Sequence, residues 1–198
     1  SLSVVDGTLR DYTAAAIEEE DRWLSGVLAS LEGIAPVSLS PGSRIDRAVA
    51  LAQIRFLLHL HQVRRYQERA LDTYTSEPFR ALDWQMQGMT QTGAATYGTA
   101  GEWGLVVTRV AAIPSFLSVA QQQLLTGVGN HRTPDPRMLL RDGINTAEAN
   151  AKYFADTLPG LAASRINGPD RDRLLAELRA ACRQAAGAYL TFRDFVGA

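Results

Sequence analysis

Apolar residues recur along most of this chain at the spacing of an α-helix. The clearest start lies at Ser40-Pro41, where a hydroxyl that can cap a helix precedes a proline suited to the first helical turn. No glycine or proline occurs between Gly42 and Pro78. The apolar stripe that follows comprises Ile45, Val49, Ala52, Phe56, Leu60, Val63, Tyr66, Ala70 and Tyr74. It predicts one helix over 40–74, about 50 Å long, that is buried on most sides in its first half and is the long central helix of the fold.

Turn-forming residues divide the rest of the chain into further helical segments. Asp6-Gly7 predicts the start of a first helix, and Gly33 followed by Pro36 predicts its end. A linker is expected at 75–78, and an irregular loop from Gly88 to Gly101. The remaining predicted helices cover 79–86, 102–113, 115–125 after a break at Pro114, 136–158 behind Asp135, and 170 to the end.

The pattern as a whole predicts an all-α protein. Period-two alternation of apolar and polar residues, the mark of a half-buried strand, is missing over more than a few residues. Residues 1–198 are therefore expected to form a single helical domain, a bundle of about six helices.

Composition narrows the classes of function. Lys and Arg number 20 against 21 Asp and Glu, so the basic excess expected of a nucleic-acid-binding protein is missing. No apolar run approaches the roughly 18 residues of a membrane span, and no membrane association is expected. The start lacks a signal peptide, which indicates the cytoplasm, although a processed N-terminus at Ser1 leaves export open. The single cysteine excludes an intrachain disulfide and fits a reducing compartment.

The residues able to do chemistry are few and scattered. His59 and His61 are two apart, so on a helix their side chains diverge by about 200° and cannot share a metal ion. We expect His59 to flank the apolar stripe and His61 to face water. Cys182 lies on an apolar stripe, where a thiol is normally inert, and the acidic run 18–21 should be mostly solvated. The sequence predicts no catalytic residue and no metal or cofactor in this chain.

Aromatic residues between Trp84 and Trp103 offer a second possibility. Trp84, Tyr97 and Trp103 lie in or beside a stretch rich in small residues, and could line a groove for a peptide or another ligand. They could equally anchor the loop in the bundle core. Together with His131, in the later loop at 127–133, they are the candidate ligand-binding residues.

The order of several motifs resembles a known family. The start of the long helix, 39–47, is similar to a leucine-serine-proline-x-x-arginine-leucine-aspartate motif that opens a long helix in the bacterial family catalogued as domain of unknown function 885. Four further features occur there in similar order: the turn at 77–78, the Ile-Pro-x-Phe-Leu element at 113–117, the loop at 127–133 with its following prolines, and a closing helix with Tyr189 and Phe192. The resemblance runs from roughly Leu24 to the end.

The resemblance carries expectations about function. Members of that family are similar to helical zinc peptidases, whose His-Glu-x-x-His motif and later Glu lie in a C-terminal half outside these residues. The family thus implies that this chain is the non-catalytic N-terminal helical part of a larger, peptidase-like metalloprotein. It would form part of a substrate cleft, pack on a separate or removed zinc-binding half, and be inactive alone, with zinc implied for that half only. Its expected partner is that half, another chain or a second copy. The alternative is a free-standing helical interaction protein with an aromatic groove.

Overall fold

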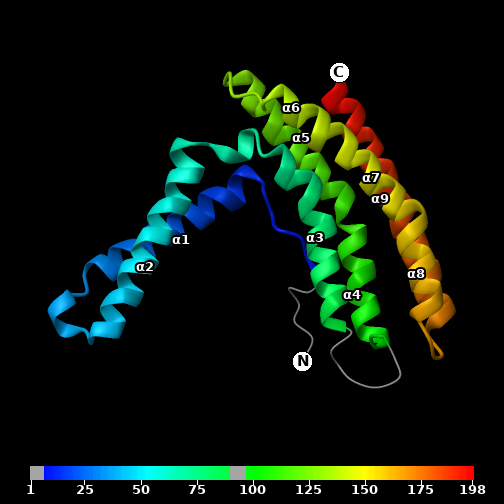
Figure 1. Cartoon of the computed structure of the whole chain (residues 1–198), viewed down its shortest axis with the longest axis horizontal. Helices are drawn as coiled ribbons and strands as arrows, with labels where there is room; N and C mark the ends of the chain where they lie inside the picture. Colours follow the sequence, from blue (N-terminus) through cyan, green and yellow to red (C-terminus); the bar gives the residue numbers. More distant parts are fainter. Residues whose placement is uncertain (1–6, 90–96) are drawn as a thin grey trace.

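The computed structural model describes residues 7–89 and 97–198, and all the regular structure in these ranges is helical (Figure 1). Six continuous helical rods make up the described chain. The first three are α1 (Ala14–Glu32), α2 (Pro41–Leu58) with its π-helical end η3 (His59–Val63), and α3 (Leu71–Met89). The fourth joins α4 (Ala100–Ala111) to α5 (Ile113–Gly129). The fifth runs through α6 (Pro136–Met138), η5 (Leu139–Thr146), α7 (Ala147–Lys152), η6 (Tyr153–Thr157) and α8 (Leu158–Arg165), and the sixth is α9 (Arg171–Gly197). The predicted all-α class is confirmed.

The rods form two parts of unequal size. Helices α1 and α2 pack against each other as a hairpin, which we call the arm (14–58), and it projects from the remaining helices, the bundle (71–198) (Figure 1). The buried residues of the arm are Ile17 and Leu24 from α1 and Leu51 and Ile54 from α2. Residues 59–70, the junction, connect the arm to the bundle and include the short 3-10 helix η4 (Tyr66–Glu68).

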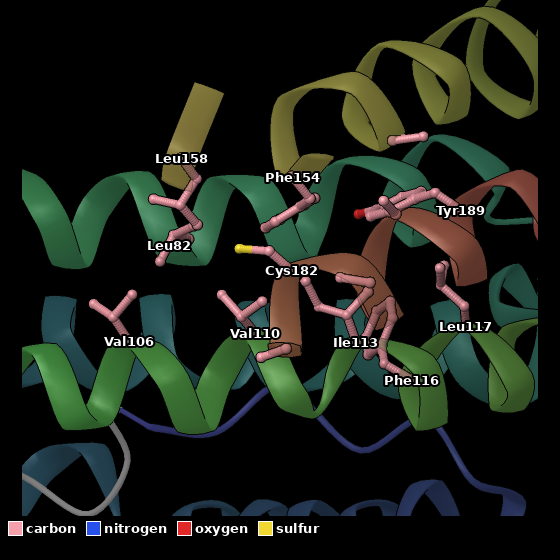
Figure 2. Close-up of a cluster of buried hydrophobic side chains, with 14 of the residues drawn as sticks. Leu82, Val106, Val110, Ile113, Phe116, Leu117, Phe154, Leu158, Cys182 and Tyr189 are labelled. Carbon is pink, nitrogen blue, oxygen red and sulfur yellow. The ribbon is translucent and has the colours of Figure 1, made fainter. Parts of the chain in front are cut away.

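The bundle core forms around the rod made by α4 and α5. Figure 2 shows its apolar side chains facing those of α3, the 153–158 segment and α9. The labelled residues are Val106, Val110, Ile113, Phe116 and Leu117 on one side and Leu82, Phe154, Leu158, Cys182 and Tyr189 on the other. Phe154 and Tyr189 stack with ring centroids 5.7 Å apart. A long central helix is thus confirmed, but it covers 100–129 and not 40–74.

The central rod, 100–129, is also unusually apolar for its length. Among the described residues it is the one helix that is long and apolar enough, by length and composition, to cross a membrane. Core helices of bundles pass the same test. Its residues Trp103, Val106, Val110 and Ile113 are at most 1% exposed inside the bundle, as in a core helix.

The predicted continuous helix over 40–74 is wrong. Helix α2 ends at Leu58, η3 follows, and Arg65 adopts a left-handed conformation with φ 47° before α3 begins at Leu71. Because of the break, the first half of the apolar stripe lies in the arm and its end packs in the bundle. Leu51 packs in the arm, while Tyr74 is fully buried in the bundle, and one straight helix could not reach both cores. Periodicity alone does not register such a break, because the apolar spacing continues across it.

The predicted linker at 75–78 is also wrong, since these residues lie inside α3 with Pro78 in the helix interior. Proline removes a backbone donor and crowds the preceding turn, which normally ends a helix. Here side chains from other helices bond to that turn: Asn150 Nδ2 and Tyr189 OH donate to the Thr75 carbonyl oxygen at 2.7 and 3.1 Å. Tertiary hydrogen bonds thus offset the local cost, and local pattern cannot reveal them.

The first helix begins later than expected. Thr13 is its N-cap and accepts from the Ala16 amide, whereas the predicted cap, Asp6, lies outside the described residues. Residues 8–12 are not helical and lie on the bundle, because Arg109 Nε donates to the Thr8 carbonyl oxygen at 3.0 Å and Gln123 Nε2 to that of Tyr12 at 2.6 Å. The apolar positions in this segment therefore pack on the bundle without forming a helical face.

The later helix starts agree with the sequence. Asp135 Oδ1 accepts from the Arg137 amide at 2.8 Å, and Pro136 follows in the first turn. Helix α9 begins directly after Asp170. The predicted break at Pro114 is wrong, because α4 and α5 continue as one helical rod over 100–129, with Pro114 inside it. Pro159 does not end its helix as predicted, because the rod continues from η6 into α8, and Pro159 lies just after the π-helical segment.

Candidate functional site

The arm has an apolar face that the bundle does not cover. Ile45, Val49 and Phe56 are 66, 63 and 54% exposed, and Val63 in η3 is 65% exposed. Spacings of four and seven residues place the first three on one side of α2, opposite the Leu51 side that packs on α1. The sequence predicted that this stripe would be buried. It is exposed because the stripe lies on the side of α2 that faces away from α1, and the bundle is built from other helices.

The junction holds a buried histidine. His61 is 1% exposed, its Nδ1 lies 2.7 Å from Asp21 Oδ1, and its ring stacks on Tyr66 with centroids 5.6 Å apart. His59 is exposed. This reverses the expectation for the two histidines. His61 follows Ile54 by seven residues and so lies on the side of the helix that packs on α1. Asp21 belongs to the acidic run that was expected to be mostly solvated.

A second set of contacts continues from the junction into the bundle. The Tyr12 ring meets those of Tyr74 and Phe116 edge-on, with centroids 5.2 and 5.8 Å apart. Burial, and then the nearby Tyr66 hydroxyl, raise the pKa of Tyr12, so it stays a neutral phenol. Arg10 lies over the Tyr12 ring and pairs with Glu20 of the arm at 2.7 Å. These residues connect arm, junction and bundle.

Glu68 forms a buried ionic centre at the bundle end of the junction. Its side chain is fully buried, and its carboxylate accepts from Arg65 at 2.7 Å, Arg132 at 2.8 Å and Asn130 at 3.3 Å. Burial opposes ionisation, but the three donors outweigh it and hold the pKa of Glu68 below its usual value. Both arginines are partly exposed, and all three donors are used in holding the chain together, so this centre is structural.

No metal site is formed by the described residues. Within 7–89 and 97–198, no three His, Cys, Asp or Glu side chains converge as a metal ion would require. His61 already bonds to Asp21, and His59 and His131 are exposed. The donor set that zinc prefers is therefore not found in the described part of the chain.

The four candidate ligand-binding residues do not meet in one place. Trp103 is 1% exposed and donates from Nε1 to the Tyr97 carbonyl oxygen at 2.9 Å. Tyr97 donates to the Met86 carbonyl oxygen, and Arg165 lies 3.9 Å above its ring. Trp84 is exposed on α3, and His131 is exposed in a tight turn with φ 56°. Trp103 and Tyr97 thus anchor the chain, and ligand binding by the four residues stays a prediction.

Open hollows on the described surface add little chemistry. One of about 210 Å³ lies beside Trp84 and is lined also by Glu77, Arg80 and Ala81. Another, of about 590 Å³, lies between α7 and α9, with Lys152 among its lining residues. Neither brings together an acid, a base and a nucleophile in hydrogen-bond contact, the arrangement that a catalytic site needs.

Cys182 is expected to be unreactive in the folded protein. Burial raises the pKa of its thiol to about 12, and the thiolate is the reactive form. A thiol-specific disulfide reagent at neutral pH should therefore leave the native protein unmodified and titrate one thiol after denaturation. Rapid reaction of the native protein would contradict the burial of Cys182 in the bundle core.

The fold and its surface define a class: an all-α protein in which a helical arm with an exposed apolar face projects from a well-packed bundle. The chain belongs to the family described as bacterial protein of unknown function (DUF885), which it matches over residues 1–198. The family resemblance inferred from the sequence is thereby confirmed. Searches of curated proteins and of solved structures gave no significant match.

Proposed function

We propose that this chain is the non-catalytic helical part of a peptidase-like metalloprotein, and that α2 packs on a zinc-binding half. The observation that carries the proposal is the exposed apolar face of Ile45, Val49 and Phe56. Family membership and the similarity of that family to helical zinc peptidases support it. The arm would then form part of a substrate cleft between the two halves.

The apolar face differs from ordinary surface residues in its arrangement. Single exposed apolar side chains are common on soluble proteins, but a row of large ones on one side of a projecting helix marks an interaction surface. Full burial of one such side chain contributes about 1.5–3 kcal/mol. Because each residue here is more than half exposed, covering the row would contribute several kcal/mol to association.

The zinc ligands indicate what each half would contribute to the reaction. The described residues provide no set of ligands for zinc, so the metal and the activation of water would belong to the other half. This chain would contribute binding and orientation: the bundle as a rigid support and the arm as a wall that limits where a peptide can lie.

A double substitution on the apolar face tests the proposal. Val49→Ser together with Phe56→Ser should weaken association with a separately expressed zinc-binding half of this family, one that carries His-Glu-x-x-His, by at least about tenfold. A tenfold loss corresponds to about 1.4 kcal/mol, less than the apolar burial removed. Titration calorimetry measures the affinity, and zinc-dependent peptide hydrolysis by the mixture measures the function.

The chain offers a matched control for this experiment. Leu125 and Val128 in α5 are 57 and 55% exposed, and Leu125→Ser with Val128→Ser removes similar apolar surface from the bundle. The control should bind like the wild type. Equal losses in both double variants would show that α2 is not the contact, and absence of any complex with the wild-type chain would refute the proposal itself.

A further inference from the structure

Two segments of chain join the arm to the bundle, and they lie at the same end of the arm. One is the cap of α1 at Thr13, and the other is the junction, 59–70 (Figure 1). Helices α1 and α2 pack on each other, and the bundle helices pack among themselves. Such a pair of connections at one end is the geometry of a two-stranded hinge, in which a few residues at element ends absorb the dihedral changes.

The junction contains two locally unfavourable features within three residues. Arg65 has φ 47° and ψ 47°, a left-handed conformation that L residues with long side chains rarely adopt. Gln67 is 2% exposed, and its Oε1 has no hydrogen-bond partner among the described residues. Its Nε2 donates to the His61 carbonyl oxygen at 3.4 Å, so flipping the amide would set two oxygens against each other. A buried acceptor without a donor costs free energy that a changed arrangement could recover.

The present angle of the arm is held by a continuous set of side-chain contacts. Asp21 of α1 bonds to His61, and His61 stacks on Tyr66. Tyr66 lies near Tyr12, whose ring and carbonyl are held by the bundle residues Phe116 and Gln123. Each link joins a different element, so loss of one link separates the arm from the bundle along this path.

We propose that the junction and Thr13 form a hinge on which the arm turns relative to the bundle, with the Asp21–His61–Tyr66 contacts setting its angle. Breaking a contact allows Arg65 and Gln67 to leave their unfavourable arrangement while the helices of the arm stay paired. The hinge is a property of the isolated chain and goes beyond the proposed function. Its turning would also redirect the apolar face of α2 with respect to the bundle.

Distance measurements between spin labels test the hinge. Labels on Ala35→Cys at the tip of the arm and Ser118→Cys on α5 occupy exposed positions in separate parts, and buried Cys182 stays unlabelled. Pulsed electron–electron double resonance should give one narrow distance distribution between the two labels in the otherwise unchanged chain. Asp21→Ala should broaden it or add a second population, with helical circular dichroism unchanged.

Control variants distinguish motion at the hinge from a general loss of structure. Glu19→Ala, an exposed position two residues away on α1, should leave the distribution unchanged. Asp21→Asn keeps an oxygen that can accept from Nδ1 and should largely restore the narrow distribution. If Asp21→Ala lowers the helical signal, Tyr66→Phe provides the second test, because it keeps the ring on His61 and removes the hydroxyl near Tyr12.

The outcomes decide the proposal. A broadened or split distribution in Asp21→Ala or Tyr66→Phe, with Glu19→Ala unchanged, supports a hinge held by these contacts. An unchanged distribution in both folded variants overturns it, because the angle would then be set elsewhere. Equal broadening in Glu19→Ala also overturns it, since the effect would not depend on the His61 contact.

Discussion

Replacing Gly127 with alanine is expected to destabilise the protein by on the order of 3 kcal/mol or more. A Cβ at this position of α5 would overlap the Glu68 carbonyl oxygen and lie 2.8 Å from that of Arg132. Both obstacles are backbone atoms, so no flexible side chain can move aside. Relief requires separating α5 from the junction, which would also disturb the hydrogen bonds around Glu68. Urea unfolding followed by circular dichroism measures the loss.

The same helix provides the control. Gly129 lies two residues further along α5, and a Cβ there would meet nothing within 4 Å. Gly129→Ala should therefore leave the free energy of unfolding unchanged or raise it slightly, because alanine is the better helix former. Similar behaviour of the two variants would contradict the close approach of α5 to η4.

Glu68→Gln is expected to cost about 2–3 kcal/mol of stability at neutral pH. The substitution keeps the size of the side chain but removes the charge that binds Arg65, Arg132 and Asn130. The cost stays below that of breaking a fully buried pair, because the two arginines are about 40% exposed and can be hydrated. As a control, Glu177→Gln breaks an exposed ion pair with Arg173. This substitution should leave the free energy of unfolding unchanged within error.

The pH dependence of this difference has a definite sign. The pKa of Glu68 is lowered in the folded protein, so its contribution is complete above the pKa of the unfolded chain, about 4.3 for a glutamate. It is lost as the pH falls further, through the folded value. Wild type and Glu68→Gln should therefore differ most at neutral pH and converge in acid. A difference that persists unchanged in strong acid would show that packing, and not ionisation, carries the effect.

The helix starts could be predicted because their causes are local. Ser40 Oγ accepts from the Ser43 amide, and Asp135 Oδ1 from the Arg137 amide, each within three residues of the cap. A proline follows both caps and needs no donor in the first turn. The apolar stripe that carries Cys182 in α9 could be predicted for the same reason, because all of its residues belong to one helix.

The breaks could not be predicted, because residues distant in sequence decide them. Pro78 is tolerated inside α3 through hydrogen bonds from Asn150 and Tyr189 to the Thr75 carbonyl oxygen. The two donors lie 75 and 114 residues from Thr75 in the sequence. The same holds for the candidate site. The pairing of His61 with Asp21 joins the junction to α1 of the arm across forty residues, and no spacing rule connects them.

The amino-acid sequence by itself determined that this protein is an all-α member of its family, since periodicity, caps and the order of motifs are properties of short stretches. Only the tertiary structure decided which apolar stripe is buried. The stripe of Ile45, Val49 and Phe56 has the same periodicity as a core face, and it stays exposed because the chain turns at Arg65 and builds its core around 100–129. Burial depends on which surfaces meet, and that is settled by the packing of all the helices together.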